Sequence, residues 1–193
     1  PGPDGLPYAA WQAGGAASAT TLYLLLLHVL DGGYTSKCFN DSLTVYLLKG
    51  TNINDTPGYI ARKVQDTRIL SLKNIDNKII CSAMNYISKP IMSAYISRIQ
   101  RGFIHGRQLI ENVLDLDTFA HIHALTSSLI DMPILVFFDF AAAFPSVSHK
   151  WLFKTLRAMN FPEGYINLIK TMYTNNNALY SNGIVNEYIT MFS

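Results

Sequence analysis

The sequence predicts a fold of the α+β class, on two observations. Its 193 residues are 49% hydrophobic and only 15% charged, which provides enough apolar material for a packed core and excludes general disorder. Several long segments repeat apolar residues at helical spacing, whereas short runs of strand-forming residues lie between them. The chain contains no internal repeat and no low-complexity tract, so a single packed region, or a large piece of one, is expected.

Helices and strands are assigned from the spacing of apolar residues and from turn signals. Helices are expected at residues 16–30, 74–99, 108–129, 148–159 and 162–173. Pro90 predicts a kink or a break in the second of these helices. Strands are expected at residues 42–48, 68–72 and 133–140, and the Asn182-Gly183 pair predicts a hairpin within residues 178–191. The run at 133–140 is continuously apolar, which is typical of a strand buried on both faces.

Charge and cysteine content restrict the class of protein further. The net charge is +2, but residues 61–107 hold nine basic and two acidic side chains, a local charge of +7. Cys38 and Cys81 are too few for a disulfide framework or a four-thiolate zinc site, and they suit a reducing compartment. The longest apolar stretch, residues 22–30, is too short to span a bilayer. We therefore expect an intracellular protein, cytoplasmic or nuclear, without a membrane anchor.

Asp139 is the residue whose position most clearly suggests chemistry. A carboxylate at the exposed end of a buried strand is held rigidly, which suits a metal ligand or a general base. The alternative is a turn residue that caps the following segment. Phe144, five residues later, would close the floor of a pocket near this acid or would lie in the core.

The order of five motifs carries more information than any one of them. These motifs are Gly2-Pro3-Asp4-Gly5, the strand end Val45–Lys49, the segment Arg68–Asn74, the connector Gln100–Arg107, and Asp139–Phe144. In this order and at this spacing the chain resembles the reverse transcriptases of non-LTR (LINE-type) retrotransposons over nearly its whole length. The resemblance implies an RNA-directed DNA polymerase that performs two-metal, template-directed nucleotidyl transfer in its full-length form.

The resemblance also implies roles for individual residues. Asp139 matches the first catalytic, metal-binding aspartate, and the main-chain carbonyl of Phe140 would support the same Mg²⁺. Phe144 matches the steric gate that selects deoxynucleoside triphosphates over ribonucleotides. Lys49 and Arg68 match residues that bind the incoming nucleotide, although solvated surface cations are the common alternative.

A nucleic-acid surface is implied by the same resemblance. The basic block would contact the RNA template and the DNA primer through their phosphates, and salt would weaken that affinity. The residues expected to contact nucleic acid are Lys73, Gln100, Arg101, Gly102, Phe103 and Arg107. For Phe103 the alternative is an anchor that stabilises a turn. His121 and His123 are two positions apart on an expected helix and face different sides, so surface histidines are favoured over a metal site.

Three departures from the family pattern affect this interpretation. Pro145 follows Phe144 where the family has an aspartate, and Ile69-Leu70 replaces a Pro-Ile pair; both changes affect local loop geometry. The chain ends at Ser193, before the expected pair of aspartates that completes the catalytic site, and before the rest of the palm and the thumb. We therefore expect a fragment, an incomplete right-hand polymerase fold, that is inactive alone.

The expected domain organisation follows from the motifs. Residues 1–130 would form a fingers-like region with helices and the basic block, and residues 131–193 the first part of the palm, with a metal-binding strand, two helices and a hairpin. Two other hypotheses fit the sequence. The chain would be a catalytically dead remnant that only binds nucleic acid nonspecifically, or a purely structural α+β domain with no affinity for nucleic acid.

Overall fold

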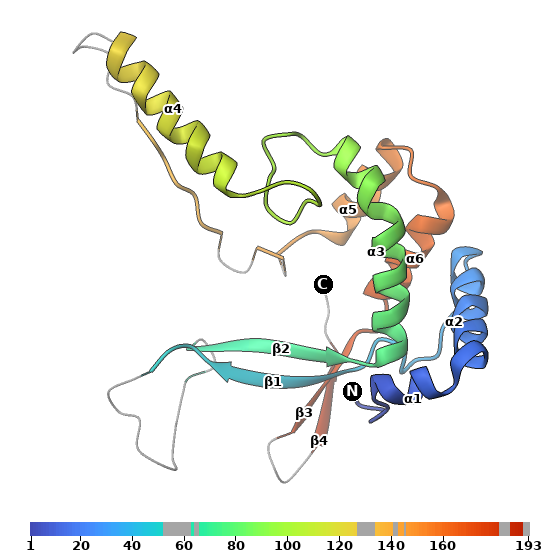
Figure 1. Cartoon of the computed structure of the whole chain (residues 1–193). Coiled ribbons are helices and arrows are strands. Elements are labelled where there is room, and N and C mark those ends of the chain that lie inside the picture. Colours follow the sequence, from blue (N-terminus) through green and yellow to red (C-terminus); the bar gives the residue numbers. More distant parts are fainter. Residues whose placement is uncertain are drawn as a thin grey trace. The chain divides into compact units, whose positions relative to one another are not determined.

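The computed structural model describes residues 1–51, 63, 66–126, 134–140, 143–144, 146–181 and 186–190 (Figure 1). Helices and strands are both present, which confirms the predicted α+β class. The chain divides into two compact units, one formed by Pro1–Cys81 with Phe144–Ser193 and the other by Ser82–Ala143. These unit boundaries differ from the boundary between fingers and palm that the sequence predicts at residues 130 and 131. The fingers and palm division stays a prediction.

The first unit contains a four-stranded sheet in the order β2-β1-β3-β4. The strands are β1 (Ser42–Leu48), β2 (Thr67–Lys73), β3 (Asn177–Ser181) and β4 (Asn186–Thr190). β1 pairs antiparallel with β2 over its whole length and parallel with β3 over three residue pairs. β3 and β4 pair antiparallel, which confirms the two strands of the predicted hairpin, whereas Asn182 and Gly183 lie outside the described residues.

Helices α1 (Tyr8–Ala13), α2 (Gly15–Leu30), α5 (His149–Ala158) and α6 (Glu163–Tyr173) belong to the same unit. α2 and α5 both pack on α6. Leu22 and Val29 of α2 are buried, as are Ile166 and Leu168 of α6, so the apolar core lies where these two helices meet. Ser148 caps α5 by accepting a hydrogen bond from the Trp151 amide, which explains why this helix begins where the sequence predicts.

The amino-terminal loop is fastened to the end of β2. The Asp4 amide donates to Asn74 Oδ1 at 3.2 Å, and the Asp4 carboxylate accepts from the Leu6 amide at 3.1 Å. Gly2 lies so close to Lys73 and Asn74 that a Cβ there would overlap both. This close approach explains the glycine at position 2 of the first motif, and the hydrogen bond between Asp4 and Leu6 braces the segment that follows.

Helix α3 (Ile75–Tyr95) begins in the first unit, and its residues from Ser82 onward belong to the second. It runs through Pro90 as one helix, so a break at that residue is wrong. A connector at residues 96–109 leads to α4 (Ile110–Thr126), and residues 134–140 follow in extended form without regular secondary structure. No helix of the described ranges is both long and apolar enough to cross a membrane.

The predicted buried strand at 133–140 is the main error about the fold. Residues 134–140 pair with no described strand, and their apolar side chains are exposed; Phe138, for example, is 82% accessible. Ile134 and Leu135 instead line a small apolar pocket with Leu116 and Phe119 of α4. A strand inside a sheet requires neighbouring strands as hydrogen-bonding partners at its edges. Within the described residues, no strand pairs with this segment.

The core at the α2–α6 contact gives a direct prediction about stability. Leu168→Ala should lower the free energy of unfolding by about 2–5 kcal/mol, because Leu168 is 2% exposed and its loss leaves a cavity. Leu125→Ala is the matched control, since Leu125 is 86% exposed, and it should change stability by less than about 0.5 kcal/mol. Denaturant unfolding of the two variants measures both values. Equal destabilisation would contradict this location of the core.

The carboxyl of Asp76, in the first turn of α3, predicts a pH dependence. Burial raises its pKa above the ordinary value of 3.8, the Asn77 amide opposes this shift by donating to it, and nearby Asp4 adds to it. As the pH rises above 3.8, the unfolded chain loses this proton before the folded chain does, so the free energy of unfolding falls.

We expect the wild-type protein to lose stability relative to Asp76→Asn as the pH rises from about 4 toward neutrality, because the asparagine carries no charge to bury. Thermal unfolding over a pH series measures the difference between the two proteins. Asp31→Asn, at an exposed position, is the control and should follow the wild type. If the difference in stability between wild type and Asp76→Asn is the same at every pH, the raised pKa of Asp76 would be contradicted.

Candidate functional site

The β1/β2 hairpin brings Lys49 and Arg68 to the same face. Leu47 lies opposite Arg68 in the antiparallel register, and the Lys49 amide donates to the Asp66 carbonyl at 3.0 Å, which continues that register. Because residues two apart on a strand share a face, Lys49 and Arg68 are diagonal neighbours across the pair. Two cations that are diagonal neighbours on one face of a strand pair can contact neighbouring oxygens of one polyphosphate.

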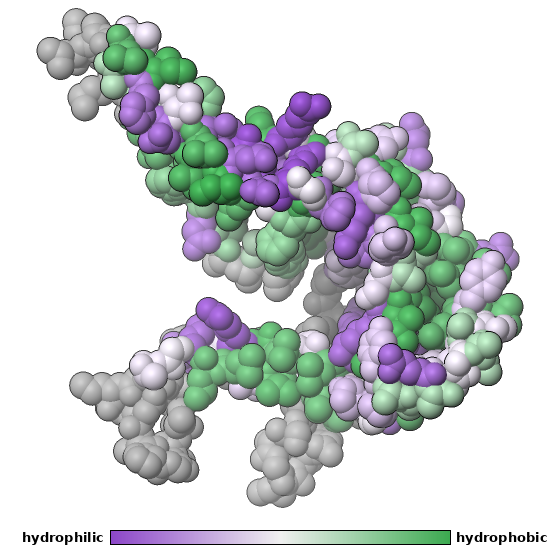
Figure 2. All heavy atoms as spheres, viewed as in Figure 1, coloured by the Kyte–Doolittle hydropathy of each residue, from purple (hydrophilic) through white to green (hydrophobic). Residues whose placement is uncertain are grey.

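The hairpin that carries these cations is largely apolar on its surface. Val45, Leu47 and Leu48 of β1 and Ile69 and Leu70 of β2 are all exposed. Figure 2 shows hydrophobic residues along the visible face of β1 and β2. Among the described residues, β1 pairs with β3 as far as Thr44 and with β2 alone beyond it. The two strands therefore project from the sheet as a ribbon with Lys49 and Arg68 toward its far end.

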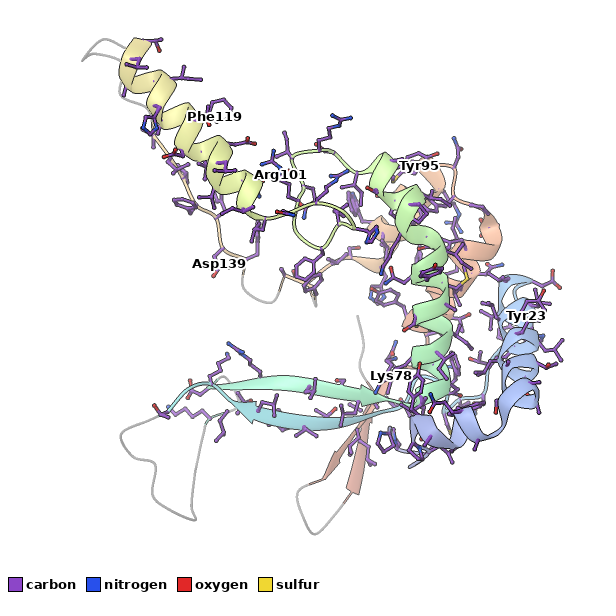
Figure 3. All side chains as sticks on the ribbon, viewed as in Figure 1. Tyr23, Lys78, Tyr95, Arg101, Phe119 and Asp139 are labelled. Carbon is purple, nitrogen blue, oxygen red and sulfur yellow. The ribbon has the colours of Figure 1, made fainter. Side chains whose placement is uncertain are left out.

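Asp139 and Phe144, which the sequence predicts to share one pocket, belong to different units. Asp139 is exposed in the extended segment 134–140 of the second unit (Figure 3), whereas Phe144 is the first residue of the returning part of the first unit. Phe144 is 82% exposed, so it is not a core residue of the described structure. Lys49 and Arg68 belong to the first unit together with Phe144.

The atoms at Asp139 that could bind a metal are oxygens, the donor type that a magnesium ion prefers. An exposed carboxylate and the neighbouring Phe140 carbonyl are hard oxygen donors, and Mg²⁺ in polymerase-type sites is held by one or two carboxylates with substrate phosphates and water. Within the described ranges, no group of three or more His, Cys, Asp or Glu side chains is placed to hold a metal ion. Asp139 and Phe140 could therefore supply some of the protein ligands of a magnesium site, and further ligands would have to come from elsewhere.

Arg107 fixes the connector between α3 and α4. Its guanidinium donates to four main-chain carbonyls, those of Ser93, Ile96, Ser97 and Gln100. These carbonyls belong to the last turn of α3 and the residues just after it, where the helix itself provides no donors. Arg107 thus acts as a C-terminal cap, a role that the sequence analysis missed when it placed this residue in a nucleic-acid surface.

Arg101 binds side chains at the start of α4. Its guanidinium forms ion pairs with Glu111 at 3.0 Å and Asp115 at 2.7 Å, and it donates to Asn112 Oδ1. The two acids are four residues apart on one face of α4, and Figure 3 shows Arg101 at the junction of the connector with this helix. Arg101 and Arg107 together hold the connector at both of its ends.

This fastened connector presents Phe103 to solvent. Phe103 is fully exposed and has a φ of 63°, a left-handed backbone conformation that is costly for a bulky residue. The side-chain Nε2 of Gln100 donates to the Gly102 carbonyl at 3.0 Å and closes the turn before Phe103. The alternative reading of Phe103 as a turn anchor does not fit, because an anchoring ring would pack on the chain.

Lys73, the remaining cation of the predicted nucleic-acid surface, points into the protein. Its ammonium donates to Asn176 Oδ1 at 2.6 Å and to the Asn40 carbonyl at 3.3 Å. Burial lowers the pKa of Lys73, while nearby Cys81 and Asp41 act in the opposite direction. Lys73 is therefore an internal hydrogen-bond donor in this structure.

Asn40 and Asn77, which sequence reasoning did not single out, are both 3% exposed and lie beside Lys73. Asn, Asp and Ser, the residue types at positions 40–42, favour turns, and the structure places a turn there, with the Asp41 amide donating to the Cys38 carbonyl. A separate pocket of about 240 Å³ is lined by residues 32–35 and by the carboxyl-terminal part of α6, and none of the predicted site residues lines it.

The cap formed by Arg107 can be tested without any ligand. In Arg107→Lys the charge is kept but the planar fork that reaches four carbonyls is lost, so amide hydrogens in residues 100–107 should exchange about tenfold faster or more, since each charge-assisted hydrogen bond contributes roughly 1.5–3 kcal/mol. Arg98→Lys, at an exposed position, is the control. Equal exchange in the two variants would contradict the capping role.

The comparisons with known proteins agree with the motif order. The family model described as reverse transcriptase (RNA-dependent DNA polymerase) matches residues 56–190. Over 115 residues, 58% of this chain, the sequence is 30% identical to the Transposon TX1 uncharacterized 149 kDa protein of Xenopus laevis, of which the chain covers 8%. This likeness to a transposon protein agrees with the predicted non-LTR type. The chain belongs to the reverse transcriptases, as the sequence predicts.

Proposed function

We propose that the chain is the fingers and the first part of the palm of an RNA-directed DNA polymerase, which in its full-length form carries out template-directed nucleotidyl transfer. The observation that carries this proposal is the match of the reverse transcriptase model to residues 56–190, since that span includes Arg68, the connector and Asp139. In its complete form the enzyme would have a right-hand polymerase fold.

The incoming deoxynucleoside triphosphate would be bound from the β1/β2 hairpin. Arg68 has a planar guanidinium that can bind two phosphate oxygens at once, and Lys49 adds a second positive charge on the same face. The projecting ribbon supports this role, because a two-stranded arm can close over a substrate that the palm holds. Neutralising the triphosphate makes its pyrophosphate a better leaving group.

The reacting end of the primer would meet Asp139. When bound there, Mg²⁺ would supply positive charge for the developing oxyanion. The chain's own contribution would be the oxygen donors of two consecutive residues at the end of the segment 134–140, the exposed Asp139 carboxylate and the Phe140 carbonyl. The exposed apolar side chains of this segment support its incorporation into a larger sheet in the complete polymerase, beside strands of the remaining palm.

The template and the primer would be contacted by the connector at Gln100, Gly102 and Phe103. A fully exposed ring on a turn that Arg101 and Arg107 hold in place offers a flat surface for a base, and stacking on an aromatic ring tolerates any sequence. Phosphate contacts would come from exposed cations of the basic block, among them Lys89 and Arg98. No observation favours the alternative of a catalytically dead remnant.

Primer extension by the full-length polymerase that contains this chain tests the proposal. Asp139→Asn should lower the extension rate by about 10³-fold or more, because the loss of several kcal/mol of charge stabilisation costs about tenfold per 1.4 kcal/mol. Asp117→Asn, a change of the same chemistry at an exposed position on α4, should leave the rate unchanged. Extension by Asp139→Asn at the wild-type rate would refute the assignment.

Selection of the sugar tests Phe144 separately. Phe144→Ala should lower the preference for deoxynucleotides over ribonucleotides by at least about tenfold, since removing the ring opens space for a 2′-hydroxyl. Phe144→Tyr keeps the bulk and should keep the preference. The measurement is the ratio of kcat/KM for a dNTP and the matching rNTP, and an unchanged ratio in Phe144→Ala would exclude a gate at this position.

A further inference from the structure

A partly buried polar cluster joins the base of the β1/β2 hairpin to the rest of the first unit. We call it the Asn40 cluster, and it consists of Asn40, Lys73, Asn77 and Asn176. The Asn40 side-chain amide donates to the carbonyls of Thr171 and Thr174 at the end of α6. Its side-chain oxygen accepts from Asn77 Nδ2 at 2.9 Å and from Lys73 Nζ at 3.5 Å.

Each member of the cluster lies at the end of a different element. Asn40 precedes β1, Lys73 is the last residue of β2, Asn77 lies in the first turn of α3, and Asn176 precedes β3. Lys73 Nζ bridges Asn176 Oδ1 and the Asn40 carbonyl, so one ammonium connects the hairpin to the strand beside it. A neutral side chain without donors at residue 73 would leave both oxygens without this partner.

Within the described part of the chain, the hairpin pairs with the rest of the sheet at its base. The β1–β3 pairing consists of Ser42–Ala178, Leu43–Leu179 and Thr44–Tyr180, all at the same end as Lys73. Arg68 is five residues from Lys73 along β2, which corresponds to about 17 Å of strand. A tilt of about 5° at the base would therefore move Arg68 by roughly 1.5 Å, and displacements of this size are costly for reacting groups.

We infer that the Asn40 cluster sets the direction of the β1/β2 hairpin, and that Lys73 is a positioning residue for nucleotide binding that acts through Arg68. This inference rests on the proposed function, in which the hairpin binds the triphosphate. It replaces the nucleic-acid contact predicted for Lys73 with an internal role. The ammonium hydrogen-bonds to the Asn40 carbonyl before β1 and to Asn176 Oδ1 before β3.

Steady-state kinetics of the full-length polymerase test the inference with Lys73→Met, which keeps the stem of the side chain and removes the ammonium. We expect the KM for dNTP to rise about fivefold or more, with kcat and the Kd for primer–template within about twofold of wild type. Lys154→Met, the same substitution at an exposed position on α5, is the control and should change none of these constants. Asn176→Ala removes the acceptor of the 2.6 Å hydrogen bond and serves if Lys73→Met does not fold.

The double variant Arg68→Ala/Lys73→Met separates positioning from a general loss of structure. If Lys73 acts through Arg68, Lys73→Met should raise the KM for dNTP by less than about twofold once Arg68 is absent. Fully additive effects, or an unchanged KM in both Lys73→Met and Asn176→Ala, would overturn the inference while leaving the proposed function intact. An unchanged KM in Arg68→Ala alone would overturn the proposed role of the hairpin and the inference with it.

Discussion

The hydrogen bonds of the Asn40 side chain are the constraint on which the architecture of the first unit depends. An amide that is 3% exposed must find partners inside the protein, because a buried polar group without them costs about 1–3 kcal/mol. Asn40 finds them at the end of α6, at the start of α3 and at the end of β2. Such a network is satisfied only when all of its members are in place, so it specifies one arrangement of these elements.

The hairpin follows from this constraint. Once its base is fixed, pairing between β1 and β2 continues for the length of both strands, whereas the described pairing with β3 covers three residue pairs. Toward its far end the hairpin carries Lys49 and Arg68 on a common face. In the connector, too, internal polar contacts hold a segment whose tip is exposed. Arg107 binds main-chain carbonyls and Arg101 binds carboxylates, and the turn between them presents Phe103 to solvent.

Local patterns in the sequence predicted most elements, and contacts between distant residues account for what they missed. The strand at 42–48 and the helices around α2, α5 and α6 were predicted closely because their apolar spacing, caps and glycines are local signals. The segment at 133–140 was wrong as a strand because its formation requires neighbours that no local pattern reports. Lys73 and Asn176 are 103 residues apart, so no spacing rule could have shown that this lysine is internal. The motif order, in contrast, led to the family, which the comparisons confirm.

The central claim is that the face of the hairpin with Lys49 and Arg68 binds the triphosphate of the incoming nucleotide. Photochemical labelling is the most direct measurement, using a dNTP with a photoreactive group on its γ-phosphate and the full-length polymerase bound to primer and template. The account predicts that mass spectrometry finds the label on residues 45–51 or 66–70, and that unmodified dNTP competes it away. Labelling confined to other segments, with the hairpin unmodified, would contradict it.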